Sequence, residues 1–237
     1  MQAVQAVLST LFIPSCAACE AHVPLTTPLC PPCSISLDPV GPACPRCAEP
    51  QVAEPANVCA RCRTEAWPLE HLIAPWRYGG ELGRALRRLK FAPRPHLARE
   101  LAPLAAPFLA AAVTHAGIDV IVPIPLHWRR LASRGFNQAE ALARHARNHA
   151  ALTTPIDTRA LARLRATAPQ THLDAAARRV NLEGALAVRR PARVVGRRVL
   201  VVDDIVTTGA TMAAAGHALR AAGAAAVIGF AFARAER

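Results

Sequence analysis

The chain has 237 residues, of which 52% are apolar, so it can bury at least one sizeable hydrophobic core. Its formal net charge of +12 favours an anionic partner, whether a phosphorylated metabolite, a nucleic acid or a membrane surface. Lys90 is the single lysine among 28 basic residues, an arginine bias that codon usage in a GC-rich genome produces, so charge alone does not choose among these partners.

No apolar run reaches the roughly 18 to 20 residues that a membrane-spanning helix needs. The run over residues 101–113 is short, and Pro103 and Pro107 interrupt it. Residues 1–15 are mildly apolar and precede Cys16, but no lysine or arginine precedes these apolar residues, as it would in a secretory or lipoprotein signal. We therefore expect a cytoplasmic protein that does not insert into a membrane.

The cysteines form four Cys-x-x-Cys pairs near the N-terminus, separated by ten, ten and eleven residues: Cys16, Cys19, Cys30, Cys33, Cys44, Cys47, Cys59 and Cys62. Eight thiolates at this spacing predict two closed zinc sites that serve folding. Sequential and crossed pairing of the knuckles are both compatible with the spacing. A disulfide framework is the alternative, which we disfavour because cytosolic thiols are kept reduced. A redox Cys-x-x-Cys would be single and lie between a strand and a helix.

Near residue 65 the sequence changes from a stretch rich in cysteine and proline to short apolar runs that alternate with alanine- and arginine-rich stretches. This change predicts a zinc-ribbon-like module over residues 1–65 and an α/β domain over residues 66–237. In the second region, residues 119–122, 199–202 and 226–233 are typical of short buried strands. Helices are predicted over residues 97–113, 137–150 and 211–222, the second capped by Asn137 and the third closed by Gly223. Strands and helices in this order predict a parallel sheet with right-handed crossovers.

Residues 199–211 place two carboxylates, Asp203 and Asp204, directly after an apolar strand, followed by a hydroxyl-rich turn and a helix. Ligands bind at the carboxyl ends of strands in open α/β sheets, where this acidic pair can accept hydrogen bonds from two ribose hydroxyls. The turn leads into a helix N-terminus, which suits a phosphate. Gly209 permits a close approach to the ligand. An ordinary strand, turn and helix is the alternative, because the same residue types favour caps and turns.

All thirteen residues of this segment match the phosphoribosyl pyrophosphate motif of type I phosphoribosyltransferases. Further matching segments are the cysteine pairs, residues 122–127 (Val-Pro-Ile-Pro-Leu-His), 134–138 (Arg-Gly-Phe-Asn-Gln) and 167–170 (Thr-Ala-Pro-Gln). Together they resemble the ComF-type proteins of DNA uptake and utilisation over nearly the whole chain. The resemblance implies a Rossmann-like parallel sheet flanked by helices behind a cysteine-rich zinc module.

The resemblance also implies which residues contact the substrate. Asp203 and Asp204 would be the catalytic carboxylates, residues 123–127 and Arg129, Arg130 and Arg134 would face pyrophosphate, and residues 165–170 would close over the site. Lys90 matches the family, although the turn after it is proline-rich where the family has a glycine, and a surface lysine is the alternative. The full set of implied substrate contacts is Val202, Asp203, Asp204, Ile205, Val206, Thr207, Thr208, Gly209, Ala210, Thr211, Pro123, Pro125, Arg134 and Lys90.

Three functions are compatible with these motifs. The first is a ComF-like protein that handles incoming single-stranded DNA, works with DNA-uptake or recombination proteins, and carries a phosphoribosyl pyrophosphate site with Mg²⁺ and two structural Zn²⁺. The second is an ordinary salvage or biosynthetic phosphoribosyltransferase, which does not need a zinc module. The third is a noncatalytic module for single-stranded DNA, which the aromatic content of 4% disfavours because few bases could stack.

Overall fold

The structure, a computed structural model of the full chain, describes residues 15–24, 27–51, 57–91, 94–165 and 184–236. Its elements in chain order are α2 (Pro31–Ile35), α3 (Ala60–Thr64), β1 (Leu72–Ile73), β2 (Trp76–Arg77), α4 (Gly80–Phe91), α5 (His96–Leu101), η1 (Ala102–Leu104), α6 (Ala106–His115), β3 (Val120–Pro123), α7 (Trp128–Arg134), α8 (Gln138–His149), β4 (Leu161–Arg163), β5 (Leu186–Val188), η3 (Pro191–Arg193), β6 (Arg198–Val206), α10 (Ala210–Ala221) and β7 (Ala226–Arg234).

The central sheet is parallel, as predicted, with the strand order β1, β7, β6, β3. β2 continues the edge that β1 forms along β7. β6 and β7 lie in the middle of the sheet, and most of their residues are apolar and buried because both faces of these strands are covered. β4 and β5 form a separate antiparallel pair. The structure thus confirms the type I phosphoribosyltransferase-like α/β fold.

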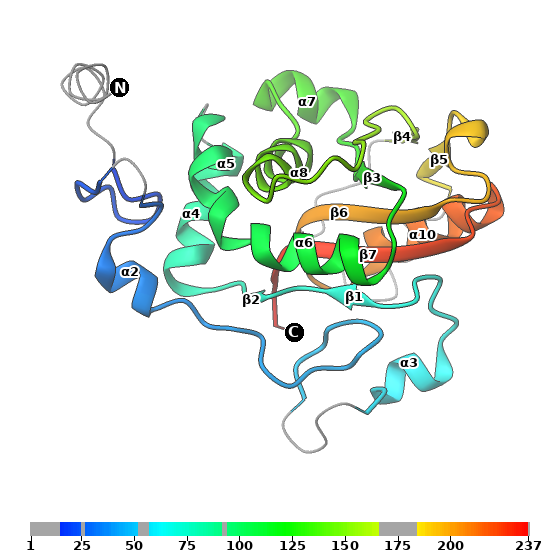
Figure 1. Cartoon of the computed structure of the whole chain (residues 1–237), viewed down its shortest axis with the longest axis horizontal. Coiled ribbons are helices and arrows are strands. Elements are labelled where there is room, and N and C mark those ends of the chain that lie inside the picture. Colours follow the sequence, from blue (N-terminus) through cyan, green and yellow to red (C-terminus); the bar gives the residue numbers. More distant parts are fainter. Residues whose placement is uncertain (1–14, 25–26, 52–56, 92–93, 166–183, 237) are drawn as a thin grey trace.

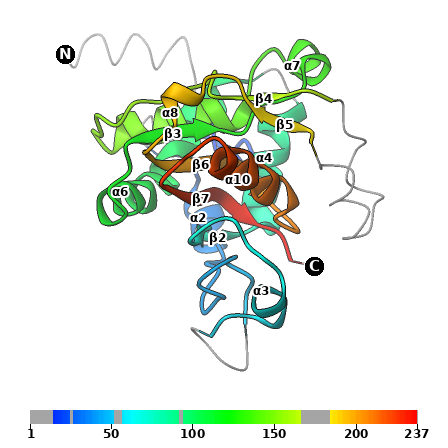
Figure 2. The ribbon, with the colours of Figure 1, turned by 90° about the vertical axis from the view of Figure 1, so that its right-hand side faces the viewer.

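Helices cover both faces of the sheet (Figure 1). Alternate residues of β6 point to opposite faces, so that Leu200 packs with α5, α6 and α8, whereas Val201 packs with α10. Cysteines of the first two knuckles belong to the core on the α8 side, and those of the last two belong to the core on the α10 side. Each cysteine module is therefore an extension of one of the two cores. In Figures 1 and 2, α3, which follows the last cysteine pair's first member, lies at the opposite end of the molecule from α7.

The helix predicted over residues 97–113 is wrong in detail, because the chain forms α5, the short turn η1 and α6 there. Pro103 and Pro107 lie near the starts of η1 and α6, where a missing backbone N–H is tolerated. Within the described ranges, no single helix is long and apolar enough to cross a membrane. The helical segments His96–Leu104 and Ala106–His115 are long and apolar enough only when taken together, and they are bent by 65° relative to each other.

β6 runs further than predicted, because it continues to pair with β7 beyond the point where β3 ends. Pro123, the last residue of β3, lies opposite Val202. Asp203 and Asp204 are therefore inside β6 rather than after it, and Asp203 is the first residue of this strand beyond its pairing with β3. The sheet opens on that side, where the two carboxylates lie.

Candidate functional site

The eight cysteines form two groups of four, Cys16, Cys19, Cys30 and Cys33, and Cys44, Cys47, Cys59 and Cys62. Within each group the sulfur atoms lie within 4.8 Å of one another. The Sγ atoms of Cys19 and Cys30 are 3.5 Å apart, and those of Cys47 and Cys59 are 3.7 Å apart. Four thiolates about 2.3 Å from one zinc ion have sulfurs about 3.8 Å apart, whereas a disulfide requires about 2.05 Å. The donor sets therefore fit two structural zinc ions, and the knuckles pair sequentially.

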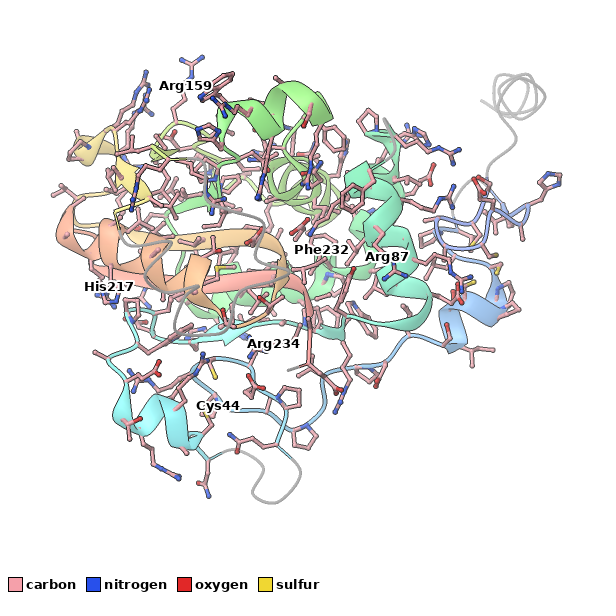
Figure 3. All side chains as sticks on the ribbon, turned by 180° about the vertical axis from the view of Figure 1, so that it is seen from behind. Cys44, Arg87, Arg159, His217, Phe232 and Arg234 are labelled. Atoms are coloured by element: carbon pink, nitrogen blue, oxygen red, sulfur yellow. The ribbon has the colours of Figure 1, made fainter. Side chains whose placement is uncertain are left out.

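Both zinc modules dock on the α/β domain through ion pairs and backbone hydrogen bonds. In the first ribbon, residues 15–36, Glu20 pairs with Arg88 of α4, whose guanidinium also donates to the carbonyl oxygen of Ala17 over 2.9 Å. In the second ribbon, residues 43–62, Glu49 pairs with the buried Arg234 at the end of β7. Figure 3 shows Arg234 beside the segment that carries Cys44. The described parts of the two ribbons are thus fixed against α4 and β7.

A cleft of about 660 Å³ opens beside the carboxyl half of β6. Its floor is formed by residues 203–207 of β6 and the turn that follows, and α4, α8 and the start of α10 supply its walls. Among the described residues, five cations and two carboxylates line it: Arg87, Lys90, Arg130, Arg134, Arg163, Asp203 and Asp204. The excess of positive charge suits a ligand that carries several negative charges.

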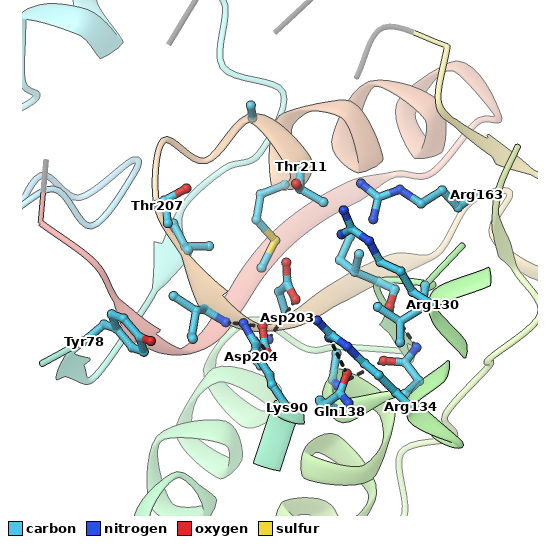
Figure 4. A pocket seen from close by; sticks show the side chains of 18 of the residues that line it. Tyr78, Lys90, Arg130, Arg134, Gln138, Arg163, Asp203, Asp204, Thr207 and Thr211 are labelled. Carbon is cyan, nitrogen blue, oxygen red and sulfur yellow. Dashed lines mark hydrogen bonds and ion pairs between the residues drawn. The ribbon is translucent and has the colours of Figure 1, made fainter. Parts of the chain in front are cut away.

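Asp203 and Asp204 meet Lys90 at the floor of the cleft (Figure 4). The Nζ atom of Lys90 is 3.0 Å from Oδ2 of Asp204. Burial, and next the charge of Asp204, raise the pKa of Asp203 to about 7, although Lys90 and Arg163 counteract the rise. A carboxyl whose pKa lies near neutrality can change its charge state when a cation or a hydroxyl-rich ligand arrives.

The turn after β6 brings the N-terminus of α10 to the same cleft. Gly209 is the N-cap residue and has a φ of +80°, a left-handed conformation that glycine adopts without strain. The hydroxyl oxygen of Thr208 accepts a hydrogen bond from the backbone N–H of Ala210 over 3.3 Å. Thr207 and Thr211 line the cleft on either side of this turn (Figure 4). The arrangement is a helix start that faces a positively charged cavity.

Arginines from two further elements, α7 and β4, line the cleft opposite the acidic pair. Arg134, at the end of α7, donates to Oε1 of Gln138 over 3.1 Å and lies over the ring of Phe91, 5.5 Å from its centroid. Arg163, the last residue of β4, reaches toward Thr211 and Arg130 (Figure 4). Burial lowers the pKa values of both Arg134 and Arg163, although neighbouring carboxylates oppose the shift. Partly desolvated guanidinium groups of this kind bind phosphate oxygens strongly.

Most of the predicted substrate contacts line the cleft: Asp203, Asp204, Ile205, Val206, Thr207, Gly209, Ala210, Thr211, Arg134 and Lys90. The lining residues do not include Val202 and Pro123, which are buried in their strands, nor Thr208, Pro125 and the exposed Arg129. Residues 166–170 of the predicted closing loop lie outside the described residues. The roles of all these residues stay predictions.

Sequence reasoning missed Arg163, Gln138, Tyr78, Arg87 and Phe91, which also line the cleft. Arg163 lies 40 positions before Asp203, in a segment without a recognisable motif. Among 27 arginines nothing in the sequence distinguishes it, because only the pairing of β4 with β5 places it at the cleft. Gln138 ends the matched segment 134–138 but was given no contact role there, whereas Tyr78, Arg87 and Phe91 come from α4 and the loop before it and could be found only through packing.

The geometry agrees with the comparisons to known families. Residues 114–236 match the family described as phosphoribosyl transferase domain, and residues 7–71 match the one described as double zinc ribbon domain. The fold and the site thus define a protein with a type I phosphoribosyltransferase domain and a double zinc ribbon. The remaining comparisons place it more narrowly.

Curated relatives include the DNA utilization protein YhgH of Escherichia coli, which is 36% identical over 189 residues, 75% of this chain and 80% of the relative. YhgH of Salmonella typhimurium is 35% identical over 178 residues, 74% of this chain and 77% of the relative. Competence protein F of Haemophilus influenzae is 32% identical over 164 residues, 66% of this chain and 69% of the relative. The chain belongs to the ComF family, as its motifs predicted.

Proposed function

We propose that this chain binds 5-phosphoribosyl pyrophosphate with Mg²⁺, transfers its phosphoribosyl group, and acts in the cytoplasm in DNA uptake and utilisation during natural transformation. The observation that carries the proposal is the content of one cleft. An acidic pair, a helix start with a left-handed glycine and a group of arginines and lysine face the same cavity. The names of the relatives, which refer to DNA utilisation and competence, support the biological role.

Each part of the ligand has a counterpart in the cleft. The 5′-phosphate would lie on the backbone amides of residues 207–211 at the start of α10. The two ribose hydroxyls would donate to Asp203 and Asp204. Pyrophosphate would lie toward the loop after β3, where Arg130 and Arg134 supply charge-assisted hydrogen bonds together with Arg163 from β4.

The donor set also fits a magnesium ion, because Asp203 and Asp204 offer carboxylate oxygens beside the place of the ligand's own phosphate oxygens. Bound there, Mg²⁺ would neutralise charge on the departing pyrophosphate. Lys90 is already held against Asp204 and adds a fixed positive charge at the floor. Since the pKa of Asp203 is raised to about 7, its ionised form becomes more populated from pH 6 to pH 8, and ligand binding should strengthen over the same interval.

The reaction we propose is a substitution at C1 of the ribose. The bond from C1 to the pyrophosphate oxygen breaks, and pyrophosphate leaves with the electron pair. A nitrogen of the acceptor forms the new bond to C1 from the opposite face and then loses its proton. The arginines stabilise the negative charge that grows on the leaving group, and the carboxylates face the positive charge that develops on the sugar.

Isothermal titration calorimetry with phosphoribosyl pyrophosphate tests the binding step. We expect one site per chain with Mg²⁺ present. In magnesium-free buffer, which leaves the zinc sites loaded, the affinity for phosphoribosyl pyrophosphate should be markedly weaker. Ribose 5-phosphate and pyrophosphate added separately should each compete. Absence of binding in the zinc-loaded protein at pH 8 would contradict the proposed function.

A surface next to the cleft supports a second activity, weak binding of single-stranded DNA. α7 buries none of its residues, and it exposes Trp128, with 64% of its surface accessible, and Leu131. The Arg129 guanidinium lies 5.3 Å from the Trp128 ring centroid. Phe91, 77% exposed, lies under Arg134. Exposed aromatic rings interleaved with arginines are what stacking of unpaired bases requires, although such rings are few in this chain.

Titration of a short oligonucleotide across a salt series tests this second activity. Affinity should fall steeply with salt because phosphate contacts release counterions, and neutralising Arg129, Arg130 and Arg134 should flatten the dependence. Repeating the titration with saturating phosphoribosyl pyrophosphate shows whether both anions share one cleft. If no oligonucleotide binds at low salt, the role in DNA utilisation is indirect, and a small-molecule transferase becomes the leading function.

A further inference from the structure

Arg61 of the second ribbon hydrogen-bonds to the turn at residues 207–211, the predicted phosphate-binding loop. Arg61 lies in α3 between the zinc-site residues Cys59 and Cys62. Its Nη1 atom donates a hydrogen bond of 2.6 Å to the backbone carbonyl oxygen of Thr208, 147 positions later in the sequence. Arg61 does not line the cleft, so the Thr208 carbonyl group is held on the side of the loop that faces the ribbon.

Trp67 and Arg46 make this contact part of a rigid unit. The Arg61 guanidinium lies over the indole of Trp67, 5.4 Å from the ring centroid. The same indole rests on Gly209 so closely that a Cβ atom there would be 2.7 Å from the ring. Arg46 donates to the carbonyl oxygens of Cys62, at 2.9 Å, and of Trp67, at 3.3 Å. The zinc knuckle, the indole and the loop are therefore in direct contact with one another.

The orientation of the peptide between Thr208 and Gly209 follows from that contact. In a trans peptide the C=O and N–H groups point to opposite sides of the chain. Because Arg61 holds the Thr208 carbonyl toward the ribbon, the N–H of Gly209 points the other way, where Gly209 lines the cleft. Glycine has low barriers to backbone rearrangement, so a peptide next to it can flip and present its carbonyl oxygen to the ligand instead.

We propose that Arg61 is a positioning residue for phosphate binding, which holds the peptide between residues 208 and 209 so that the Gly209 N–H donates to the 5′-phosphate. The inference rests on the proposed function, since it concerns the same cleft. It assigns the second ribbon a role in ligand binding in addition to folding. Because Arg61 lies between two thiolates of one zinc site, the orientation of the loop depends on the metal in that site.

Arg61→Gln tests the proposal, and Arg63→Gln is the matched control. Arg63 lies on the same short helix, carries the same charge, is exposed, and bonds to the carbonyl oxygen of Val58 instead of the loop. Calorimetry would compare three ligands: phosphoribosyl pyrophosphate, ribose 5-phosphate and inorganic pyrophosphate. A hydrogen bond to a charged group contributes enough that its loss weakens binding roughly tenfold to a hundredfold.

We expect Arg61→Gln to weaken the two ligands that carry a 5′-phosphate by that factor, and to change the affinity for pyrophosphate by less than about twofold. Arg63→Gln should bind all three like the wild type. Both variants should retain the wild-type zinc content, which elemental analysis checks, and Arg61→Lys should recover part of the affinity because an ammonium can also donate to the carbonyl.

The outcomes separate this inference from the proposed function. If the wild type binds none of the three ligands, the proposed function fails, and the role of Arg61 fails with it. If the wild type binds and Arg61→Gln binds ribose 5-phosphate equally well, only the role of Arg61 is refuted. An equal loss for all three ligands in a zinc-loaded, folded variant also refutes it, because a general disturbance of the cleft would explain that result.

Discussion

Replacing Asp203 by asparagine should make the stability of the protein less dependent on pH. Burial and the neighbouring charge of Asp204 raise the pKa of Asp203 from 3.8 to about 7 in the folded chain. The folded state therefore keeps a proton that the unfolded state releases, and the free energy of unfolding falls as pH rises from about 4 to about 7. Asparagine does not titrate, and its side-chain oxygen can still accept from the N–H of Asp204, as Oδ1 of Asp203 does over 2.9 Å.

The magnitude follows from the size of the pKa change. One pKa unit corresponds to about 1.4 kcal/mol, so a rise of some three units sets an upper limit of about 4 kcal/mol. Asp203 keeps contact with solvent in the cleft, which reduces the effect to roughly 1 to 2 kcal/mol between pH 5 and pH 8. Within that interval, Asp203→Asn should gain stability relative to the wild type as pH rises.

Urea unfolding of both proteins at unit steps from pH 5 to pH 8, with zinc present throughout, measures this difference. Asp157→Asn makes the same substitution at a carboxylate that does not line the cleft and controls for a general effect of replacing aspartate by asparagine. A constant difference between Asp203→Asn and the wild type at every pH would refute the assignment of a raised pKa, and so would a variant that loses stability relative to the wild type as pH rises.

Three further predictions concern the zinc sites, Gly209 and Arg163. Elemental analysis of protein purified with reductant should find about two zinc ions per chain, because two groups of four thiolates fill two closed sites. A single ion per chain would mean that half of the cysteine pairs bind no metal. Gly209→Ala should lower the free energy of unfolding by roughly 1 to 3 kcal/mol, since the φ of +80° and the indole of Trp67 both oppose a Cβ atom, and unchanged urea unfolding would contradict this. Arg163→Gln should weaken phosphoribosyl pyrophosphate binding roughly tenfold in calorimetry, whereas an unchanged affinity would exclude Arg163 from the site.

Features encoded by short spacings could be predicted from the sequence. The even intervals between Cys-x-x-Cys pairs predicted the two metal sites, although sequence alone left their pairing open. The run of apolar residues, two carboxylates, a turn and a helix predicted the acidic pair and the helix start, because these parts are neighbours along the chain. Asn137 was likewise predicted as a cap, and its side chain accepts from the N–H groups of Ala139 and Glu140.

Features that depend on contacts between distant segments could not be predicted. The ion pair of Lys90 with Asp204 and the bond from Arg61 to Thr208 join residues more than 100 positions apart. The end of β6 was misplaced because its last residues pair with β7 alone, and carboxylates within a strand are unusual by propensity. The pairing with β7 overrides that local preference.

Thermal unfolding with and without phosphoribosyl pyrophosphate and Mg²⁺ tests the central claim most directly. A ligand that binds only the folded state stabilises it by mass action, so the wild type should melt at a higher temperature with the ligand. The double variant Asp203→Asn, Asp204→Asn should lose that shift, while Asp157→Asn should keep it. An undiminished shift in the double variant would contradict the assignment of the ribose contacts to the acidic pair, and the absence of a shift in the wild type would contradict the ligand itself.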